Sequence, residues 1–376
     1  MLNALIKKNS VISQYHTVST LSVAILMTVW LLTARAGAQI SIPEPLPTFM
    51  PEAPQLDGAV AKAVRRLFST KGVASGVWVS PLQAEFSVNS LLDDGWQWRG
   101  GVSVLDDDMG VGGFSGIEAE WQIGGTLSFV AISDAGTWIG GRIGRQRLGN
   151  YDSLSLTEPS VIQTRPGARP RQSQTNPEAI ALDQAGHFLL AFEGDHRVQK
   201  HVSIEQRPSV LPVPTALGSA ATNRGIEALA VLPDGRYFAV GEDFDPTLGY
   251  RAWLWAAGDA ANWQTLAYQQ SFEDGFAWTP TAAAVMDDRM LVVERWWDGG
   301  FRFRSRLVGL PLTAVRPGAL LQPEVVMELT PLAGSFANIE GLSVVPSPRG
   351  WLALFVSDNQ RLSLLPTVLF VLEKLD

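Results

Sequence analysis

Carboxylates recur in pairs along this sequence, at positions where paired strands would bring them together. The stretch 224–244 reads RGIEALAVLPDGRYFAVGEDF, with Glu227 near the start of one apolar run and Glu242 at the end of the next. A Pro-Asp-Gly turn between the runs predicts a β-hairpin. Antiparallel pairing across this turn places Glu227 opposite Gly241 or Glu242, so both acids lie at one end of the hairpin. Carboxylate oxygens gathered in this way suit Ca²⁺ or another hard divalent cation.

The same plan recurs in four more stretches, which predicts a ring of acids. The repeated units lead with Glu118, Glu178, Glu227, roughly Thr281, and Glu340. These positions are about 50–60 residues apart, a period typical of repeat folds. The candidate metal ligands are Glu118, Glu178, Glu227, Glu242, Glu340 and Asp358, and Asp134, Glu193 and Glu294 end further strands of the same set. Thr281 departs from the acid that leads the other units.

Two explanations for such a ring stay open. Crowded carboxylates raise one another's pKa values unless something positive lies among them. That positive group is either a bound divalent cation or a set of arginines. Arg197, Arg224, Arg295 and Arg361 all lie close in sequence to one of these acids. Arginine can pair with a carboxylate through two parallel hydrogen bonds.

His196 and Arg197 are the candidate catalytic residues. They follow an acidic strand end in the stretch EGDHR, on the same predicted face as the acids. His196 could act as a general acid or base, or bind phosphate together with Arg197. A lone histidine also has a purely structural interpretation. The sequence has no cysteine and no G-x-S-x-G motif, so neither a thiol nor a nucleophile elbow is available.

The elements that must position these residues are short strands. After Gly72 the sequence consists of β-rich apolar runs separated by Gly, Pro and Asp-Gly turns, which indicates an all-β fold. Four-strand units at this period predict a β-propeller of six blades, each of four antiparallel strands, with seven blades as the nearest competitor. The segment 73–105 lacks the leading motif, and we expect it to close the ring with LFVLEKL at 369–375.

In their order and in their strand endings, the five units resemble a known family. The stretches GFSGIEAEW, NPEAIAL, RGIEALAVLPDGR, MLVVERWW and NIEGLSVV are similar to the phytase-like domain family, named for the "esterase-like activity of phytase". The resemblance covers roughly 73–376. It implies an exported β-propeller with hydrolase activity, and it supplies no catalytic residue.

The first 38 residues predict export, and residues 39–72 predict a segment that precedes the propeller. Lys7 and Lys8 precede an apolar run that ends near Ala36-Gly37-Ala38, the order of a signal peptide spanning 1–38. An uncleaved anchor is the alternative. Residues 39–72 read as a Pro-rich linker followed by a short helix at 57–68, and 73–376 as the propeller domain. We expect a periplasmic or secreted protein with no membrane span after cleavage.

Charge and composition limit the classes of molecule that the protein is expected to bind. The net charge is −8, and the charged residues of the predicted leader are all basic, so the mature chain would be more acidic still. Such a chain lacks the basic surface that nucleic acid requires. We expect a small phosphorylated or ester substrate, a divalent cation such as Ca²⁺, and no organic cofactor. The leading hypothesis is a phosphoesterase or esterase. The alternatives are a non-catalytic propeller that binds a ligand or partner, and a lactonase-like metal-dependent hydrolase.

Overall fold

Short strands account for nearly all the regular structure in the computed structural model. It describes residues 58–375 except for 83–91, 107–109, 146–148, 164–175, 218–219, 222, 246, 248, 257–261, 301, 335–337 and 363–364. The predicted signal peptide at 1–38 and most of the linker therefore lie outside the described residues. In the part of the chain that is described, no helix combines the length and the apolar character needed to cross a membrane.

The predicted short helix is present as α2, Ala59–Lys71. Val60, Val64 and Leu67 recur on one face, and all three are buried against strands of the first blade. A carboxylate stabilises the start of the helix, because Glu120 accepts hydrogen bonds from the backbone N–H of Gly58 (3.1 Å) and of Ala61 (3.2 Å).

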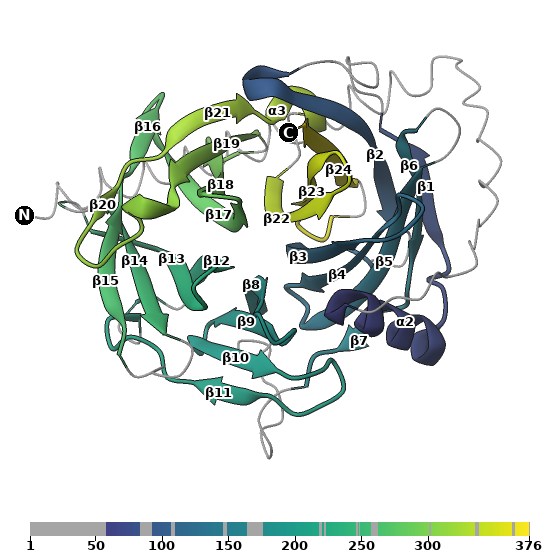
Figure 1. The fold of residues 1–376 in the computed structure, drawn as a ribbon, viewed down its shortest axis with the longest axis horizontal. Helices are drawn as coiled ribbons and strands as arrows, with labels where there is room; N and C mark the ends of the chain where they lie inside the picture. The colour runs from purple at the N-terminus through teal and green to yellow at the C-terminus, as the bar shows by residue number, and fades with distance from the viewer. Residues whose placement is uncertain are drawn as a thin grey trace, which may run out of the picture. The chain divides into compact units, whose positions relative to one another are not determined.

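The strands of the described residues form five sheets, which we number as blades in chain order (Figure 1). Blade 1 contains β3 (Phe114–Trp121), β4 (Leu127–Ser133), β5 (Thr137–Arg145), β6 (Tyr151–Leu156) and β7 (Ser160–Val161). Blade 2 contains β8 (Asn176–Leu182), β9 (Phe188–Glu193), β10 (Arg197–His201) and β11 (Ser209–Leu211). Blade 3 contains β12 (Ile226–Val231), β13 (Arg236–Asp245), β14 (Gly249–Ala256), β15 (Gln264–Tyr268) and β20 (Leu320–Leu321).

The remaining two blades include strands from both ends of the described chain. Blade 4 contains β16 (Ser271–Glu273), β17 (Phe276–Met286), β18 (Arg289–Trp297), β19 (Phe303–Pro311) and β21 (Glu324–Glu328). Blade 5 contains β22 (Asn338–Ser347), β23 (Gly350–Asp358), β24 (Thr367–Leu375), β2 (Trp96–Asp106) and β1 (Val77–Pro81). Short helical turns lie at η1 (Asp93–Gly95), η4 (Leu312–Ala314) and α3 (Thr330–Ala333).

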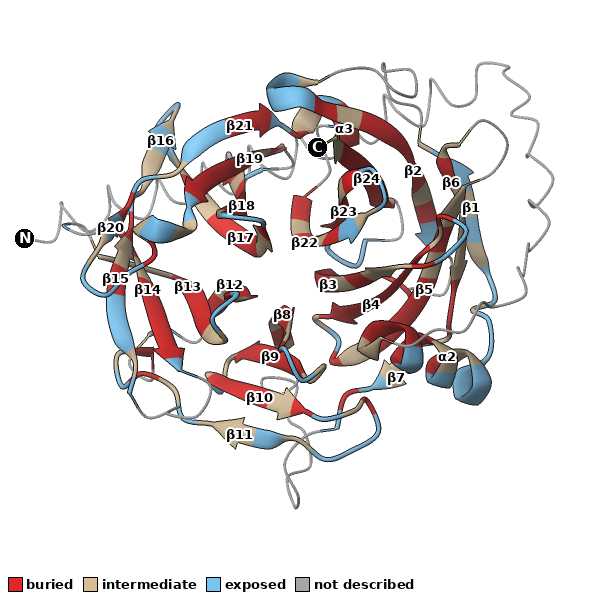
Figure 2. Ribbon diagram, viewed as in Figure 1, coloured by how far each residue is buried: buried red, intermediate tan, exposed pale blue. Residues whose placement is uncertain are grey.

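The innermost strands close into a ring, so the fold is a β-propeller. Strands β3, β8, β12, β17 and β22 contact one another in this order, and β22 also contacts β3 (Figure 1). Five buried apolar clusters fill the five interfaces between neighbouring blades. Figure 2 accordingly shows most of the inner strands as buried. Each sheet thus buries both of its faces against the adjacent blades.

The predicted number of six blades is wrong, because the described residues form five. The five repeated hairpins were counted correctly, but the N-terminal strands do not build a blade of their own. Strand β2 pairs antiparallel with β24 instead and so enters the blade that begins with β22. The blades also depart from four antiparallel strands each. For example, β20 adds a parallel fifth strand to blade 3.

The two ends of the described chain are joined within blade 5 as the sequence predicted. Residues of β2 pair with β24 from Trp96 opposite Lys374 to Val104 opposite Thr367. An ion pair links the same strands, with Arg99 Nη1 3.0 Å from Glu373 Oε2 and both side chains almost fully buried. This pairing satisfies edges that an open ring would leave exposed.

Candidate metal centre

A β-bulge lies near the start of every inner strand and sets which residue faces the ring. At each bulge the pairing with the second strand skips one residue. The skipped residues, which we call the inner positions, are Ser115, Glu178, Glu227, Thr281 and Glu340. Bulges re-aim a side chain and increase local twist, and they are common beside functional sites.

The second strand of each blade contributes one residue next to the bulge. These outer positions are Asp134, Glu193, Glu242, Arg295 and Asp358. For example, Asn176 pairs with Glu193, and the N–H of Glu242 donates to Gly225 O at 2.9 Å. The inner and outer positions together form what we call the carboxylate ring. It holds seven acids and one arginine.

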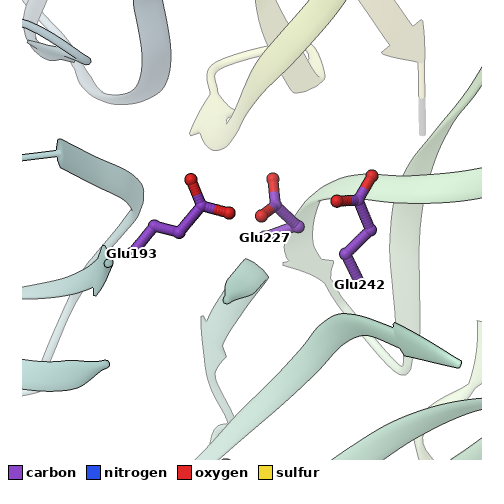
Figure 3. A group of neighbouring side chains, drawn as sticks. All are labelled: Glu193, Glu227 and Glu242. Atoms are coloured by element: carbon purple, nitrogen blue, oxygen red, sulfur yellow. The ribbon is translucent and has the colours of Figure 1, made fainter. Parts of the chain in front are cut away.

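Three of these acids lie close enough together to bind one cation. Glu193, Glu227 and Glu242 each offer a carboxylate oxygen, and these oxygens all lie within 4.8 Å of one another. They come from β9, β12 and β13, and Figure 3 shows the carboxylates of Glu193 and Glu242 on either side of Glu227. All three side chains are partly exposed. An oxygen-only donor set of this kind fits a hard cation such as Ca²⁺.

The hydrogen-bond partners of the ring are unevenly distributed. Arg295 pairs with Glu340 at 2.6 Å and with Glu242 at 3.2 Å. Asn176 donates to Glu178 and, at 3.1 Å, to Glu193. Glu227 has no hydrogen-bond or ion-pair partner among the described residues. The least satisfied acid is therefore the central member of the triad.

Burial and mutual repulsion raise the pKa values of several of these carboxyl groups. Burial raises the pKa of Glu227 well above its usual value, and the neighbouring Glu242 and Glu193 raise it further. Glu178 behaves in the same way, through burial and then Glu227 and Glu340. Burial, and then Glu340, raise the pKa of Asp358 to about 8. Without a cation, the ring therefore retains protons that ordinary carboxylates lose near neutral pH.

Arginine pairing explains only part of this ring. Arg295 serves Glu242 and Glu340, and Arg361 lowers the pKa of Asp134, which burial raises. Arg197 is directed elsewhere, because its guanidinium lies 4.0 Å above the ring of Phe192. Among the described residues, no arginine forms an ion pair with Glu178, Glu193 or Glu227. The two explanations drawn from the sequence thus apply to different parts of the ring.

Glu118 does not belong to the carboxylate ring, unlike the other predicted ligands. The bulge of β3 places Ser115 at the inner position, and Glu118 lies three residues further along the strand. Its carboxylate accepts hydrogen bonds from Leu182 N (3.1 Å) and Ser343 Oγ (3.2 Å), and burial raises its pKa to about 7. The other five predicted ligands, Glu178, Glu227, Glu242, Glu340 and Asp358, all belong to the ring.

Two of the other acids predicted at strand ends have different outcomes. Glu193, which was predicted to end a strand of the ring but was not among the candidate metal ligands, completes the triad. Glu294 lies outside the ring, buried and paired with Arg306 Nη2 at 2.6 Å and with the Tyr268 hydroxyl at 2.8 Å. Its neighbour Arg295 takes the outer position. The strand endings already placed Glu193 with the ring acids, but the exchange of Glu294 for Arg295 depends on the bulge.

His196 and Arg197 are separated by the structure. His196 lies in the turn between β9 and β10, with Nε2 3.0 Å from Ala221 O and Nδ1 buried without a partner among the described residues. Its charge is one of the influences that lower the pKa of Glu193, which burial raises. Arg197 is buried and bonds to Asp195 O at 2.9 Å. Of these two residues, only His196 therefore influences a member of the triad, Glu193.

The ring borders a narrow cavity lined by all five inner strands. Ser115, Glu227, Thr281 and Glu340 form part of its wall. The two hydroxyl groups are already engaged, since Ser115 Oγ donates to Pro177 O and Thr281 Oγ1 donates to Ile339 O at 2.8 Å. Each hydroxyl thus ties its inner strand to the next one. Neither is available as an unpaired nucleophile.

Comparison with solved structures finds proteins that are similar over most of this chain. One is the PQQ-bound aldose sugar dehydrogenase of Streptomyces coelicolor, with 13% identity, a TM-score of 0.40 and coverage of 80% of this chain and 100% of that one. Another is the major allergen Mala s 1 of Malassezia sympodialis, with 11% identity, a TM-score of 0.40 and coverage of 78% and 96%. A third is a virginiamycin B lyase of Staphylococcus aureus, with 11% identity, a TM-score of 0.34 and coverage of 78% and 94%.

Comparison with curated proteins gives no match. The family comparison does give one, and it spans the five repeated hairpins and the whole carboxylate ring. The chain belongs to the phytase-like family, described as "esterase-like activity of phytase", whose model matches residues 109–360.

Proposed function

We propose that this protein is a cation-dependent hydrolase of small ester or phosphoester substrates, with its active centre at the carboxylate ring. The observation that carries the proposal is the triad of Glu193, Glu227 and Glu242, whose central carboxylate has no partner among the described residues. A divalent cation there would relieve repulsion that Arg295 relieves only in part, because burial, Glu242 and Glu193 keep the pKa of Glu227 raised although Arg295 lowers it. Membership of the phytase-like family supports an esterase-like reaction.

The residues of the chain have separate roles in this proposal. The triad holds the cation, which would lower the pKa of a bound water and polarise an ester oxygen. Glu178 and His196 are the titratable groups available beside the triad to take or give a proton. Because the hydroxyls of Ser115 and Thr281 are engaged, we propose water as the nucleophile. No covalent intermediate with the protein is then required.

We further propose that the protein acts outside the cytoplasm, in the periplasm or as a secreted protein. The support is the order of basic residues, apolar run and Ala36-Gly37-Ala38 in the first 38 residues. Intact-mass analysis of the protein from its native host checks this. A mature N-terminus at Gln39 is expected, and recovery of the uncleaved chain in the membrane fraction would favour an anchor.

The test of the activity is a hydrolysis screen on carboxylic and phosphoric esters, with chelated protein and with added Ca²⁺, Mg²⁺ or Mn²⁺. Glu227→Gln keeps the shape of the side chain and removes its charge, so we expect it to abolish cation-dependent turnover. Glu324→Gln, on the exposed strand β21, is the matched control and should leave turnover unchanged. Hydrolysis that is insensitive to both chelator and Glu227→Gln would refute the proposed centre.

The second candidate is a propeller that binds a ligand without reaction. It is favoured by the ring hydroxyls of Ser115 and Thr281, because both are engaged in hydrogen bonds and neither is free as a nucleophile. In that case the cation would hold a ligand without reaction. Cation binding by wild-type protein, together with no turnover of any ester tested, would select this alternative.

A further inference from the structure

Arg295 interrupts the carboxylate ring at one position only. Four of the five outer positions hold an acid, and the fifth, in blade 4, holds this arginine. Its partners lie in the blades on either side, Glu242 in blade 3 and Glu340 in blade 5. We propose that Arg295 binds an anionic oxygen of the substrate and that the centre therefore selects phosphoesters over neutral carboxylic esters. This inference rests on the cation site of the proposed function.

The guanidinium lies next to the triad. Arg295 Nη2 is 3.2 Å from Glu242 Oε1, and Glu242 is one of the three residues that would hold the cation. A substrate oxygen bound to that cation would therefore lie beside the guanidinium. The Arg295 side chain is 18% exposed, so it is held in place by its partners yet still reachable from the ring.

Arg295 keeps donors available for a substrate. A guanidinium carries five N–H donors in a planar fork. The ion pairs engage Nη1 with Glu340 and Nη2 with Glu242. The N–H groups that these ion pairs leave over are of the kind that donates to phosphate oxygens. The two carboxylates fix the fork in advance, which lowers the entropy lost on binding.

Charge complementarity favours a phosphoester over a neutral ester. Seven carboxylates surround the site, and a phosphate group would be repelled unless positive charge lay on the side where it binds. The proposed cation and Arg295, both next to Glu242, provide that charge together. A neutral ester carbonyl gains from the cation but has no ground-state charge for the guanidinium to bind.

The competing role for Arg295 is structural neutralisation of Glu242 and Glu340. The two roles predict opposite effects of Arg295→Gln. If the arginine only holds the ring together, its loss should loosen the triad and weaken cation binding. If it serves the substrate, its loss removes a positive charge beside the cation, so cation binding tightens while phosphate binding weakens.

The experiment measures both affinities by calorimetry on full-length mature protein, first with Ca²⁺ alone and then with inorganic phosphate at saturating Ca²⁺. We expect Arg295→Gln to tighten Ca²⁺ severalfold and to weaken phosphate by about ten- to a hundredfold, the loss typical of a charge-assisted hydrogen bond. Arg295→Lys should restore part of the phosphate affinity. Arg304→Gln removes the same charge from the same blade, where Arg304 pairs with Glu273 and Glu328, and should change neither affinity.

The outcomes separate this inference from the proposed function. Weaker Ca²⁺ binding in Arg295→Gln, with unchanged phosphate affinity at saturating Ca²⁺, would overturn the inference and leave the cation site intact. Absence of Ca²⁺ binding in the wild type would remove the proposed function. Phosphate binding that Arg295→Gln abolishes in cation-free protein would still support the role of the arginine.

Discussion

Glu227 and Glu242 lie on consecutive strands of one hairpin and meet at the carboxylate ring, yet in the described part of the chain only Glu242 has an ion-pair partner. The difference follows from where Arg295 reaches. Its guanidinium forms ion pairs with Glu340 and Glu242, and it lowers the pKa of Glu227 without outweighing burial, Glu242 and Glu193. Glu227 is left between two other carboxylates, so the charge of this centre depends on what binds there and on pH.

Calcium should stabilise the protein through Glu227. A ligand that binds only the native state raises the free energy of unfolding by about 2.7 kcal/mol at a hundredfold excess over Kd. For a domain of this size we expect the Tm of chelated protein to rise by roughly 5 °C or more when Ca²⁺ is added. Glu227→Gln should blunt this rise, and Glu324→Gln should not. Equal Tm values with chelator, Ca²⁺ and other divalent cations would exclude the site.

Stability without a cation should fall as pH rises. The pKa values of Glu178, Glu227 and Asp358 are raised in the folded protein, that of Asp358 to about 8. The folded state therefore binds more protons than the unfolded state above the ordinary carboxyl pKa of about 4, and stability declines from there through pH 8.

Denaturant unfolding of chelated protein at pH 5, 6.5 and 8 measures this decline. Added Ca²⁺ should displace the protons and reverse the trend, so that stability at pH 8 is restored. Calorimetric titrations in buffers of different ionisation enthalpy should show proton release on Ca²⁺ binding near pH 6.5. A chelated protein whose stability increases steadily from pH 5 to 8 would contradict the raised pKa values.

The sequence allowed the hairpins and their acidic ends to be predicted, because strand alternation and turn residues are local signals. For this reason the sequence predicted one group of acids on the same face of the propeller, and the ring contains five of its members: Glu178, Glu227, Glu242, Glu340 and Asp358. The number of blades could not be predicted from such local signals. Whether 73–105 forms a sixth blade or joins the fifth depends on pairing between β2 and β24, which lie at opposite ends of the described chain.

The remaining errors at the site come from the β-bulges. Because side chains alternate along a strand, a shift of one residue exchanges the face on which each neighbour lies. The bulge of β17 at Thr281 is associated with Arg295 rather than Glu294 at the ring, and the bulge of β3 puts Ser115 where Glu118 was expected. A bulge leaves no clear signal in a short apolar run, so these two assignments needed the structure.

Acid should destabilise the interface between blades 1 and 2 through His201. This side chain is fully buried, its ring lies 5.4 Å from that of Trp138, and neither ring nitrogen has a partner among the described residues. Burial, and secondarily Arg197, lower its pKa from 6.5 to about 4. The unfolded state therefore binds the extra proton first, and stability is lost as pH falls from 6.5 towards 4. The shift corresponds to about 3 kcal/mol.

His201→Phe, which cannot be protonated, should remove this part of the acid sensitivity. The measurement is the free energy of unfolding at pH 7 and pH 4.5 for the wild type and the variant. His187→Gln is the control, because His187 is partly exposed and already bonded to Asp183. The explanation fails if His201→Phe loses as much stability between these two pH values as the wild type does.

Closure of the propeller should depend on the buried pair of Arg99 and Glu373. Both side chains are at most 5% exposed, and they join β2 to β24. Arg99→Met leaves the buried Glu373 charge with only the more distant, exposed Arg349 at 3.7 Å. Because removal of a buried partner costs about 3–5 kcal/mol, we expect a loss of up to that size. We expect the double variant Arg99→Met/Glu373→Leu to recover most of that loss, because an apolar pair of similar volume needs no desolvation of charge.

The exposed pair of Arg66 and Glu205 offers the matched control, since Arg66→Met should cost at most about 1 kcal/mol. A double-mutant cycle on denaturant unfolding measures the coupling between Arg99 and Glu373. If the double variant is as unstable as Arg99→Met alone, the loss comes from packing in blade 5 and not from the buried charge of Glu373.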